Sequence, residues 1–395
     1  MSKPTTARPT EERIAALDTL RGFAIFGILV VNILLFGTPY DVYDGVWTQP
    51  LDLVAAGFML AFAEGKFYPV FSFLFGLGFM LQMDSAARRG TDFVPFFIRR
   101  MLILFGFGLV HALLFSHFDI LAVYALLGLG LLALRNAPNP VLLGLALFSL
   151  ALPFGVRLLG GLDYAALGFT GYSDAERLAI YQQGSFASIF VARLTDLAEY
   201  YLSVIEVSAG KIFAMFLLGA WVGRQGYLQY PAQHRRLLVG VLWGGAIIGI
   251  SGGLIYAVTT LSGWEAESRL FSLVLRLYLA ASDLALAGFY IAGVTLLCQP
   301  AAWRQRLAPL ADVGRMALTN YISQSVLATT LFYGYGLGLF GQFGPAALLA
   351  MAGVIFALQV ICSRWWLQHF RMGPLEWLWR SLSYGKTTPL RRVVI

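Results

Sequence analysis

Two histidines and an aspartate, His111, His117 and Asp119, lie close together in an otherwise apolar part of the chain. An imidazole exchanges protons near neutral pH, and a carboxylate beside it fixes the tautomer and stabilises the imidazolium. We therefore expect His111, oriented by Asp119, to act as a general base on a hydroxyl or an amine. The alternative is a buried histidine bonded to a backbone carbonyl. We expect no metal site, because no third strong ligand stands at a fixed spacing.

Other polar side chains also interrupt apolar stretches, where they are costly unless they serve a pathway or a reaction. Asp18 and Arg21 are three residues apart on one helical face, and Asn32 follows about four turns later on nearly the same face. We interpret these residues as lining a route for a substrate or cofactor. The alternative is that they are ordinary boundary charges and interhelical hydrogen bonds. The other members of this predicted route are Glu64, Lys66, Arg276, Asp283, Arg315, Asn320 and Gln324.

Two pairs in this set have several interpretations. Glu64 and Lys66 flank Gly65, so they could neutralise each other, line an outer cavity, or mark a helix boundary. Arg276 and Asp283 are seven residues apart on one helical face. They could form a buried ion pair or contact other helices.

Composition indicates which elements must position these side chains. Of 395 residues, 58% are hydrophobic and 12% are charged, and the mean hydropathy is +0.72. Soluble domains carry about 25% charged residues, so a soluble globular protein is excluded. The sequence predicts an all-α fold, a polytopic membrane bundle of about ten transmembrane helices. We attribute the net charge of +7 to cytoplasmic loops rather than to nucleic-acid binding.

Apolar runs of nearly bilayer length define the expected spans. Lys and Arg gather on one side of them, which places both termini in the cytoplasm. We expect a cytoplasmic N-terminus (1–19), an N-terminal transmembrane half (20–158), a periplasmic insertion (159–206) and a C-terminal half with a cytoplasmic tail (207–395). The spans are 20–37, 60–83, 101–117, 119–134, 140–157, 207–223, 237–261, 270–297, 316–339 and 345–363.

Two outer segments have their own signals. Residues 51–63 could span separately, but the arginine-rich loop 86–100 would then lie outside. We therefore expect a short half-inserted helix that leads through Gly65 into the next span. In the periplasmic insertion, Ser173 followed by Glu176 is typical of a helix start.

Several motifs give the chain a family resemblance. The opening Leu17-Asp18-x-Leu20-Arg21-Gly22-Phe23, with Val31-Asn32-Ile33, resembles that of the YeiB-like family of bacterial inner-membrane proteins of unknown function. The segments Phe73-Leu74-Phe75-Gly76 and Asp119-Ile120-Leu121 fit the same family, as do Gly314-Arg315 through Gln324-Ser325 and Gly373-Pro374-Leu375-Glu376-Trp377. The likeness covers nearly the whole chain and is weakest over 137–200.

The first span of that family is similar to that of transmembrane acyltransferases, including bacterial glycan acyltransferases and the lysosomal heparan glucosaminide N-acetyltransferase. The resemblance implies transfer of an acyl group from cytosolic acyl-CoA to a periplasmic or lipid-linked acceptor at the outer face of the bacterial inner membrane. The glycan enzymes carry His where Asn32 stands, and the lysosomal enzyme carries a catalytic His in the next outer loop. Because 37–50 contains no His, we assign that role to His111 with Asp119.

In this interpretation guanidinium groups hold the anionic CoA, for which their planar forks are suited. Arg21 and Asn32 line the route of the acyl-pantetheine arm. Two other classes fit the same residues: a transporter or lipid-handling protein without covalent chemistry, and a structural subunit of an envelope complex. The partners are then the bilayer, the donor and the acceptor, with no nucleic acid, and a homodimer is left open. The CoA-binding arginines are Arg88, Arg89, Arg99 and Arg100.

Overall fold

The computed structural model describes residues 11–39, 46–158, 171–264 and 268–392. Within these ranges every element is helical, as expected for an all-α fold. The π-helical turn Val204–Ser208 joins the helix Phe186–Ser203 to the helix Ala209–Gln225. The helices are α1 (Glu11–Gly37), α2 (Pro50–Phe62), α3 (Phe67–Arg89), α4 (Phe93–Leu114), α5 (Leu121–Ala133), α6 (Asn139–Leu158), α7 (Asp174–Gln183), α8 (Phe186–Ser203), α9 (Ala209–Gln225), α10 (Arg235–Leu261), α11 (Arg269–Leu297), α12 (Ala301–Arg306), α13 (Ala308–Arg315), α14 (Ala317–Phe332), α15 (Pro345–His369) and α16 (Pro374–Tyr384).

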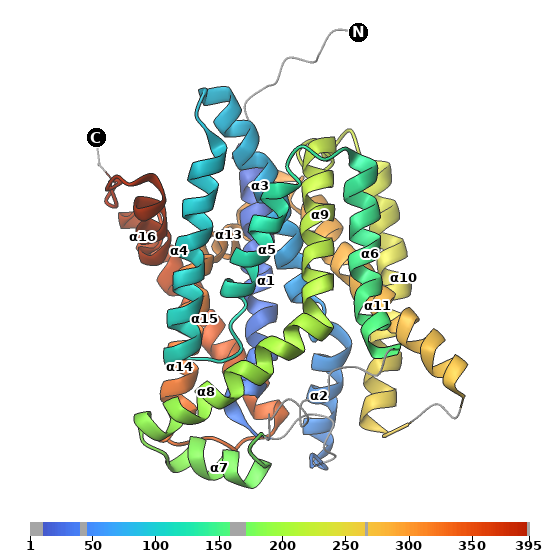
Figure 1. Ribbon diagram of the computed structural model, residues 1–395, viewed down its shortest axis with the longest axis vertical. Coiled ribbons are helices and arrows are strands. Elements are labelled where there is room, and N and C mark those ends of the chain that lie inside the picture. The colour runs from blue at the N-terminus through green and yellow to red at the C-terminus, as the bar shows by residue number, and fades with distance from the viewer. Residues whose placement is uncertain (1–10, 40–45, 159–170, 265–267, 393–395) are drawn as a thin grey trace.

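Eight helical segments of the described chain are long and apolar enough to cross a membrane, and α5 is a shorter apolar helix. Two of the eight are composite: one contains α2 and α3, with a break at 63–66 between them, and the other contains α8 and α9. This composition identifies a multi-pass membrane bundle. Helix α1 runs through its middle (Figure 1), and its buried face packs against α3, α11, α13, α14 and α15.

The two ends of the bundle differ. Toward one end, in the upper half of Figure 1, lie the start of α1, the α3–α4 turn, α13 and α16. We call this the arginine end, because Arg89, Arg99, Arg315, Arg371 and Arg380 lie there. At the opposite end α7 and α8 lie across the bundle; we call this the α7 end.

About ten spans were expected, whereas eight helical segments of the described chain are long and apolar enough to cross a membrane. The expected spans 140–157, 207–223, 237–261 and 270–297 match α6, α9, α10 and α11 within two residues at each end. Two other expected spans need correction. The span 60–83 contains a break at 63–66, where Gly65 has a φ of +75°. Pro50–Phe62 is a separate short helix, as expected for residues 51–63. The span 316–339 ends at Phe332, because the apolar segment after it forms turns around Gly338 and Gly341, which both have positive φ.

The segment expected as a periplasmic insertion, 159–206, contributes α7 and α8; residues 159–170 lie outside the described ranges. Helix α7 begins as its sequence predicts. The Ser173 hydroxyl accepts from the Glu176 backbone N–H, and the Glu176 carboxylate accepts from the Ser173 N–H at 2.8 Å. Helix α8 was not expected; it continues through the π-helical turn into α9 as one apolar segment, Phe186–Gln225.

Candidate active site

A chain of three buried side chains crosses between α4, the start of α5 and α14. The His111 Nδ1 atom lies 2.9 Å from Asp119 Oδ1, and its Nε2 atom lies 2.8 Å from the Ser325 hydroxyl. All three residues are at most 2% exposed. An ionised Asp119 only accepts hydrogen bonds, so it assigns the proton to Nδ1 and leaves the Nε2 lone pair facing Ser325.

Local structure explains why Asp119 reaches His111. Gly108 lies one turn before His111 on α4, and a Cβ atom there would overlap the Ala122 backbone and the Asp119 carboxylate. The missing side chain lets α5 start against α4. Asp119 Oδ2 accepts from the Ala122 N–H at 2.8 Å, so this carboxylate also caps the first turn of α5. Both carboxylate oxygens are therefore held.

The third group arrives on α14, whose first turn is fixed by another carboxylate. Glu376 on α16 accepts from the backbone N–H groups of Leu318 and Thr319 at 2.6 and 3.0 Å, and from the Thr319 hydroxyl at 2.6 Å. An acid at a helix N-terminus satisfies unpaired N–H groups and complements the helix dipole. The C-terminal motif around Glu376 thus positions the helix that carries Ser325.

A cavity of about 530 Å³, which we call the inner cavity, leads from the arginine end toward this triad. Its deep end is lined by Ile120, Leu121, Tyr124 and Tyr321. The Tyr321 ring lies 5.0 Å from the His111 ring, centroid to centroid, so one aromatic side chain separates the cavity from the imidazole. His111, Asp119 and Ser325 themselves are not among its lining residues.

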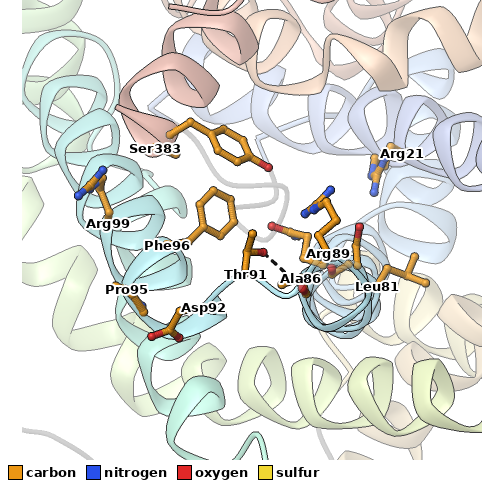
Figure 2. A pocket seen from close by; sticks show the side chains of 14 residues that line it. Arg21, Leu81, Ala86, Arg89, Thr91, Asp92, Pro95, Phe96, Arg99 and Ser383 are labelled. Atoms are coloured by element: carbon orange, nitrogen blue, oxygen red, sulfur yellow. Dashed lines mark hydrogen bonds between the residues drawn. The ribbon is translucent and has the colours of Figure 1, made fainter. Parts of the chain in front are cut away.

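A second cavity of about 590 Å³, which we call the vestibule, adjoins the inner cavity and shares Arg21 with it. Figure 2 shows Arg99 on one side of the vestibule and Arg21 with Arg89 on the other. Seven arginines and three acids line the two cavities together. They are Arg21, Arg89, Arg99, Arg100, Arg315, Arg371 and Arg380, with Asp18, Asp92 and Glu376.

All three acids are already engaged: Asp92 caps α4 by accepting from the Val94 N–H at 3.1 Å. Asp18 pairs with Arg21 at 2.7 Å, as their spacing predicts, and Glu376 caps α14. Gly22 and Gly314 let α1 and α13 touch backbone to backbone, which brings this pair beside Arg315. The cavities therefore carry an excess of positive charge and can hold a polyanion. Among the described residues, no cluster of His, Cys, Asp or Glu could hold a metal ion.

The four arginines expected to bind CoA separate in the structure. Arg89 and Arg99 line the vestibule, and Arg100 lines the inner cavity with its guanidinium 3.6 Å from the centre of the Trp379 ring. Arg88 is exposed and lines neither cavity. Arg315, Arg371 and Arg380 also line the inner cavity but were not expected to bind CoA. The sequence feature that could have identified them is the positive charge of the segments that flank α13 and α16.

Other residues of the predicted route lie elsewhere. Asn320 bonds to Ser363 at 3.0 Å, and Gln324 bonds to Gln359 at 2.8 Å, so both join α14 to α15. These contacts match the alternative interpretation, in which such residues form hydrogen bonds between helices. Asn32 is half-buried on α1 and is not among the lining residues of either arginine-end cavity.

A third cavity, of about 1050 Å³, is lined by Glu64, Arg276 and Asp283 of the predicted route; we call it the side cavity. Asp283 lies 3.2 Å from the buried Lys66 ammonium and 2.9 Å from that of Lys211. Glu64, which also lines this cavity, accepts from the Tyr256 hydroxyl at 3.1 Å. Arg276 lines the same cavity and bonds to Ser272, so Asp283 contacts other helices rather than Arg276.

His117 is near His111 in sequence but has a different environment. Its ring packs on Phe118, with centroids 3.8 Å apart, beside Tyr200, and its Nδ1 atom has no hydrogen-bond partner among the described residues. Burial and the charges of Arg177 and Arg193 lower the pKa of His117 to about 3. His117 is therefore neutral at pH 7 and lies outside the triad.

Several known proteins are similar to this chain over nearly its full length. It is 36% identical to the uncharacterized protein YxaH of Bacillus subtilis, over 97% of each chain. It is 32% identical to the uncharacterized protein YeiB of Escherichia coli, over 96% of this chain and 98% of that one. An uncharacterized 39.9 kDa protein from the amylase 3′ region of Bacillus acidopullulyticus is 33% identical, over 96% of each chain. Residues 222–386 match a protein family of unknown function, DUF418.

Proposed function

Because the chain belongs to the DUF418 family of YeiB-like membrane proteins, we propose that it is a transmembrane acyltransferase. It takes an acyl group from cytosolic acyl-CoA and delivers it to a periplasmic or lipid-linked acceptor at the outer face of the bacterial inner membrane. One observation carries this proposal. The Asp119–His111–Ser325 chain lies directly behind Tyr321, at the deep end of a cavity whose mouth is lined by arginines.

The charge of the cavities supports the donor. CoA carries a 3′-phosphate and a diphosphate, and guanidinium groups bind phosphates through paired, charge-assisted hydrogen bonds. The pantetheine arm is long and narrow, so it fits an inner cavity with apolar walls such as Phe71, Leu104 and Ile120. We therefore place the arginine end in the cytoplasm and the α7 end in the periplasm, which agrees with the Lys/Arg skew of the sequence.

The triad supports the reaction class. A neutral imidazole whose Nε2 lone pair faces a hydroxyl can take the proton of a nucleophile that attacks a thioester. Asp119 orients the ring and stabilises the imidazolium that forms. In this proposal His111 is the general base, and Arg21 lines the route of the donor.

Binding of a panel of acyl-CoAs to the purified protein tests the proposal. Acetyl-CoA, succinyl-CoA and palmitoyl-CoA are added to protein in detergent, and the thermal midpoint is recorded, because a ligand of the folded state raises it. We expect stabilisation by at least one of them. No shift with any acyl-CoA, together with no CoA release in membranes that overproduce the protein, would contradict the proposal.

Two neighbouring arginines give a matched pair of variants. Arg89→Gln with Arg99→Gln removes two charges from the vestibule, whereas Arg88→Gln removes one just outside it. We expect the first variant to bind acyl-CoA at least about tenfold more weakly, since a charged hydrogen bond contributes about 1.5–3 kcal/mol. Arg88→Gln should bind normally. Equal affinity in all forms would show that these arginines serve only topology.

The side cavity favours a second candidate, a proton-coupled transporter. Asp283 shared between two ammonium groups inside an apolar bundle is a possible site for proton exchange. Protein reconstituted in vesicles with an internal pH dye distinguishes the two functions. A transporter should show proton flux that Asp283→Asn removes and His111→Ala leaves intact. An acyltransferase should show no such flux.

A further inference from the structure

Ser325 uses its hydroxyl differently from other hydroxyl residues on the same helix. A serine or threonine inside a helix commonly donates to a carbonyl three or four residues earlier. Ser323 does so to Asn320 at 2.9 Å, and Thr330 does so to Val326 at 2.7 Å. The Ser325 hydroxyl instead bonds to His111 Nε2 within the described chain.

The direction of that hydrogen bond follows from the carboxylate. With Asp119 accepting from Nδ1–H, the Nε2 atom has no proton to give, so the Ser325 O–H donates to it. A hydroxyl that donates to an oriented imidazole is arranged to lose its proton as it attacks a carbonyl carbon. The Gly108 gap and the Glu376 cap both serve to keep these groups in contact.

Position on α14 connects Ser325 to the donor route. Tyr321 and Ser325 are four residues apart, hence on one face of the helix, and Leu318 lies on the same face one turn earlier. Leu318 and Tyr321 line the inner cavity, whereas Ser325 lies one turn beyond its deep end. An acyl chain that enters from the arginine end therefore meets Ser325 next after the Tyr321 ring moves aside.

We propose that Ser325 carries the acyl group as a covalent ester between the two half-reactions. This inference rests on the proposed acyltransferase function and adds the intermediate. A carrier suits a reaction across a bilayer of roughly 30 Å, because the nucleotide of the donor can stay at the arginine end while only the acyl group is handed on.

Both steps balance. In the first, the Ser325 oxygen attacks the thioester carbonyl while His111 Nε2 takes its proton. The carbon–sulfur bond breaks, and the CoA thiolate leaves with that proton. In the second, His111 Nε2 takes the proton of the acceptor hydroxyl or amine, whose oxygen or nitrogen attacks the ester. The Ser325 oxygen leaves and recovers its proton from His111.

Isotope exchange without an acceptor tests the intermediate. The purified protein is incubated with unlabelled acyl-CoA and radiolabelled free CoA, using whichever of acetyl-, succinyl- or palmitoyl-CoA stabilises it. Reversible formation of an acyl-serine moves the label into acyl-CoA, whereas direct transfer cannot. We expect exchange in the natural protein, and mass spectrometry of the quenched protein should find the acyl group on Ser325.

Two variants make the assay specific. Ser325→Ala should lose exchange and acylation by at least about a hundredfold but keep its acyl-CoA-dependent stabilisation, since the arginine-lined cavities are unchanged. Thr330→Ala removes an exposed hydroxyl from the same helix and should behave like the natural protein. The retained stabilisation of Ser325→Ala also shows that the variant is folded.

The outcomes separate the two proposals. If the natural protein binds acyl-CoA and transfers the acyl group, but shows neither exchange nor acylated Ser325, the covalent intermediate is wrong and acyl transfer is direct. If Ser325→Ala keeps full exchange, Ser325 is not the carrier. If no acyl-CoA binds, the acyltransferase function fails and the carrier with it.

Discussion

The contact between His111 and Asp119 shows how two residues acquire a shared role through a tight turn. His111 lies near the end of α4, Asp119 lies just before α5, and only a short turn separates the two helices. Their side chains meet in the interior, where His111 is 1% exposed and its ring lies beside that of Tyr321, so each polar atom must find a hydrogen-bond partner inside the protein. Ser325 provides the remaining partner, for His111 Nε2.

Removal of the imidazole should abolish activity without unfolding the bundle. His111→Ala is expected to lower the rate of CoA release by about 10²–10⁴-fold, the usual effect of losing one general base. His111→Gln can still hydrogen-bond, so it should be equally inactive if proton transfer is the role. Activity of His111→Gln near that of the natural protein would favour a structural histidine. Thermal midpoints measured in parallel separate folding from catalysis.

His117 should make the fold sensitive to acid. Its folded-state pKa of about 3 lies below the ordinary value of 6.5 because of burial, Arg177 and Arg193, with the neutral Tyr200 ring on its other side. Between pH 6.5 and pH 3, His117 therefore binds a proton in the unfolded chain but not in the folded chain. The stability that depends on a neutral His117 is complete above pH 6.5 and is lost as the pH falls from 6.5 toward 3. The loss is about 1.4 kcal/mol per pH unit.

Thermal midpoints recorded between pH 7 and pH 5 measure this effect. His117→Asn, which cannot take up a proton in this range, should show a shallower decline toward pH 5 than the natural protein. The exposed His369 provides a control, because His369→Asn should leave the slope unchanged. An equally steep decline in His117→Asn would assign the acid sensitivity to other groups.

At the scale of the elements, close backbone contacts at glycines determine which side chains meet. Gly22 with Gly314 joins α1 to α13, Gly76 and Gly219 join α3 to α9, and Gly108 joins α4 to α5. Small residues at such contacts are typical of helices packed in a membrane. The contact at Gly108 is the one that bears directly on the triad.

Gly108 and Gly106 form a matched pair for testing that contact. Gly108→Ala places a methyl group against the Ala122 backbone and the Asp119 carboxylate, so we expect it to push Asp119 away from His111. Overpacking of this kind costs about 1–3 kcal/mol, and loss of the Asp119 contact should remove most activity. At Gly106 the added methyl group meets open space. Equal activity and stability in the two alanine variants would contradict this role of Gly108.

Contacts between residues close in the sequence could be predicted, whereas contacts between residues far apart in the sequence could not. His111 with Asp119 and Asp18 with Arg21 are short-range pairs, which helical spacing and a single turn can place. Ser325 joins His111 across 214 residues, and no periodicity tells which helices become neighbours. Arg276 and Asp283 share a face, but two turns separate them by roughly 10 Å, too far for an ion pair.

For the whole molecule, the orientation in the membrane decides which face meets the donor. With the arginine end in the cytoplasm, a cysteine at Lys386 should be protected from an impermeant thiol reagent in intact cells, and a cysteine at Ala179 on α7 should react. Both positions are exposed, and Cys298 and Cys362 are replaced first. The opposite result is labelling at position 386, or protection at position 179 that persists after the outer membrane is permeabilised. It would show that the arginine end faces the periplasm, away from a cytosolic donor.

The cap that Glu376 places on α14 also bears on how the protein is made. Glu376 lies 57 residues after Thr319 in the chain, so the first turn of α14 is synthesised before the carboxylate that caps it. The cap on the first turn of α14 forms only when α16 packs against α14. We therefore expect the contact between His111 and Ser325 to form only near the end of synthesis, and a chain cut short before α16 to lack it.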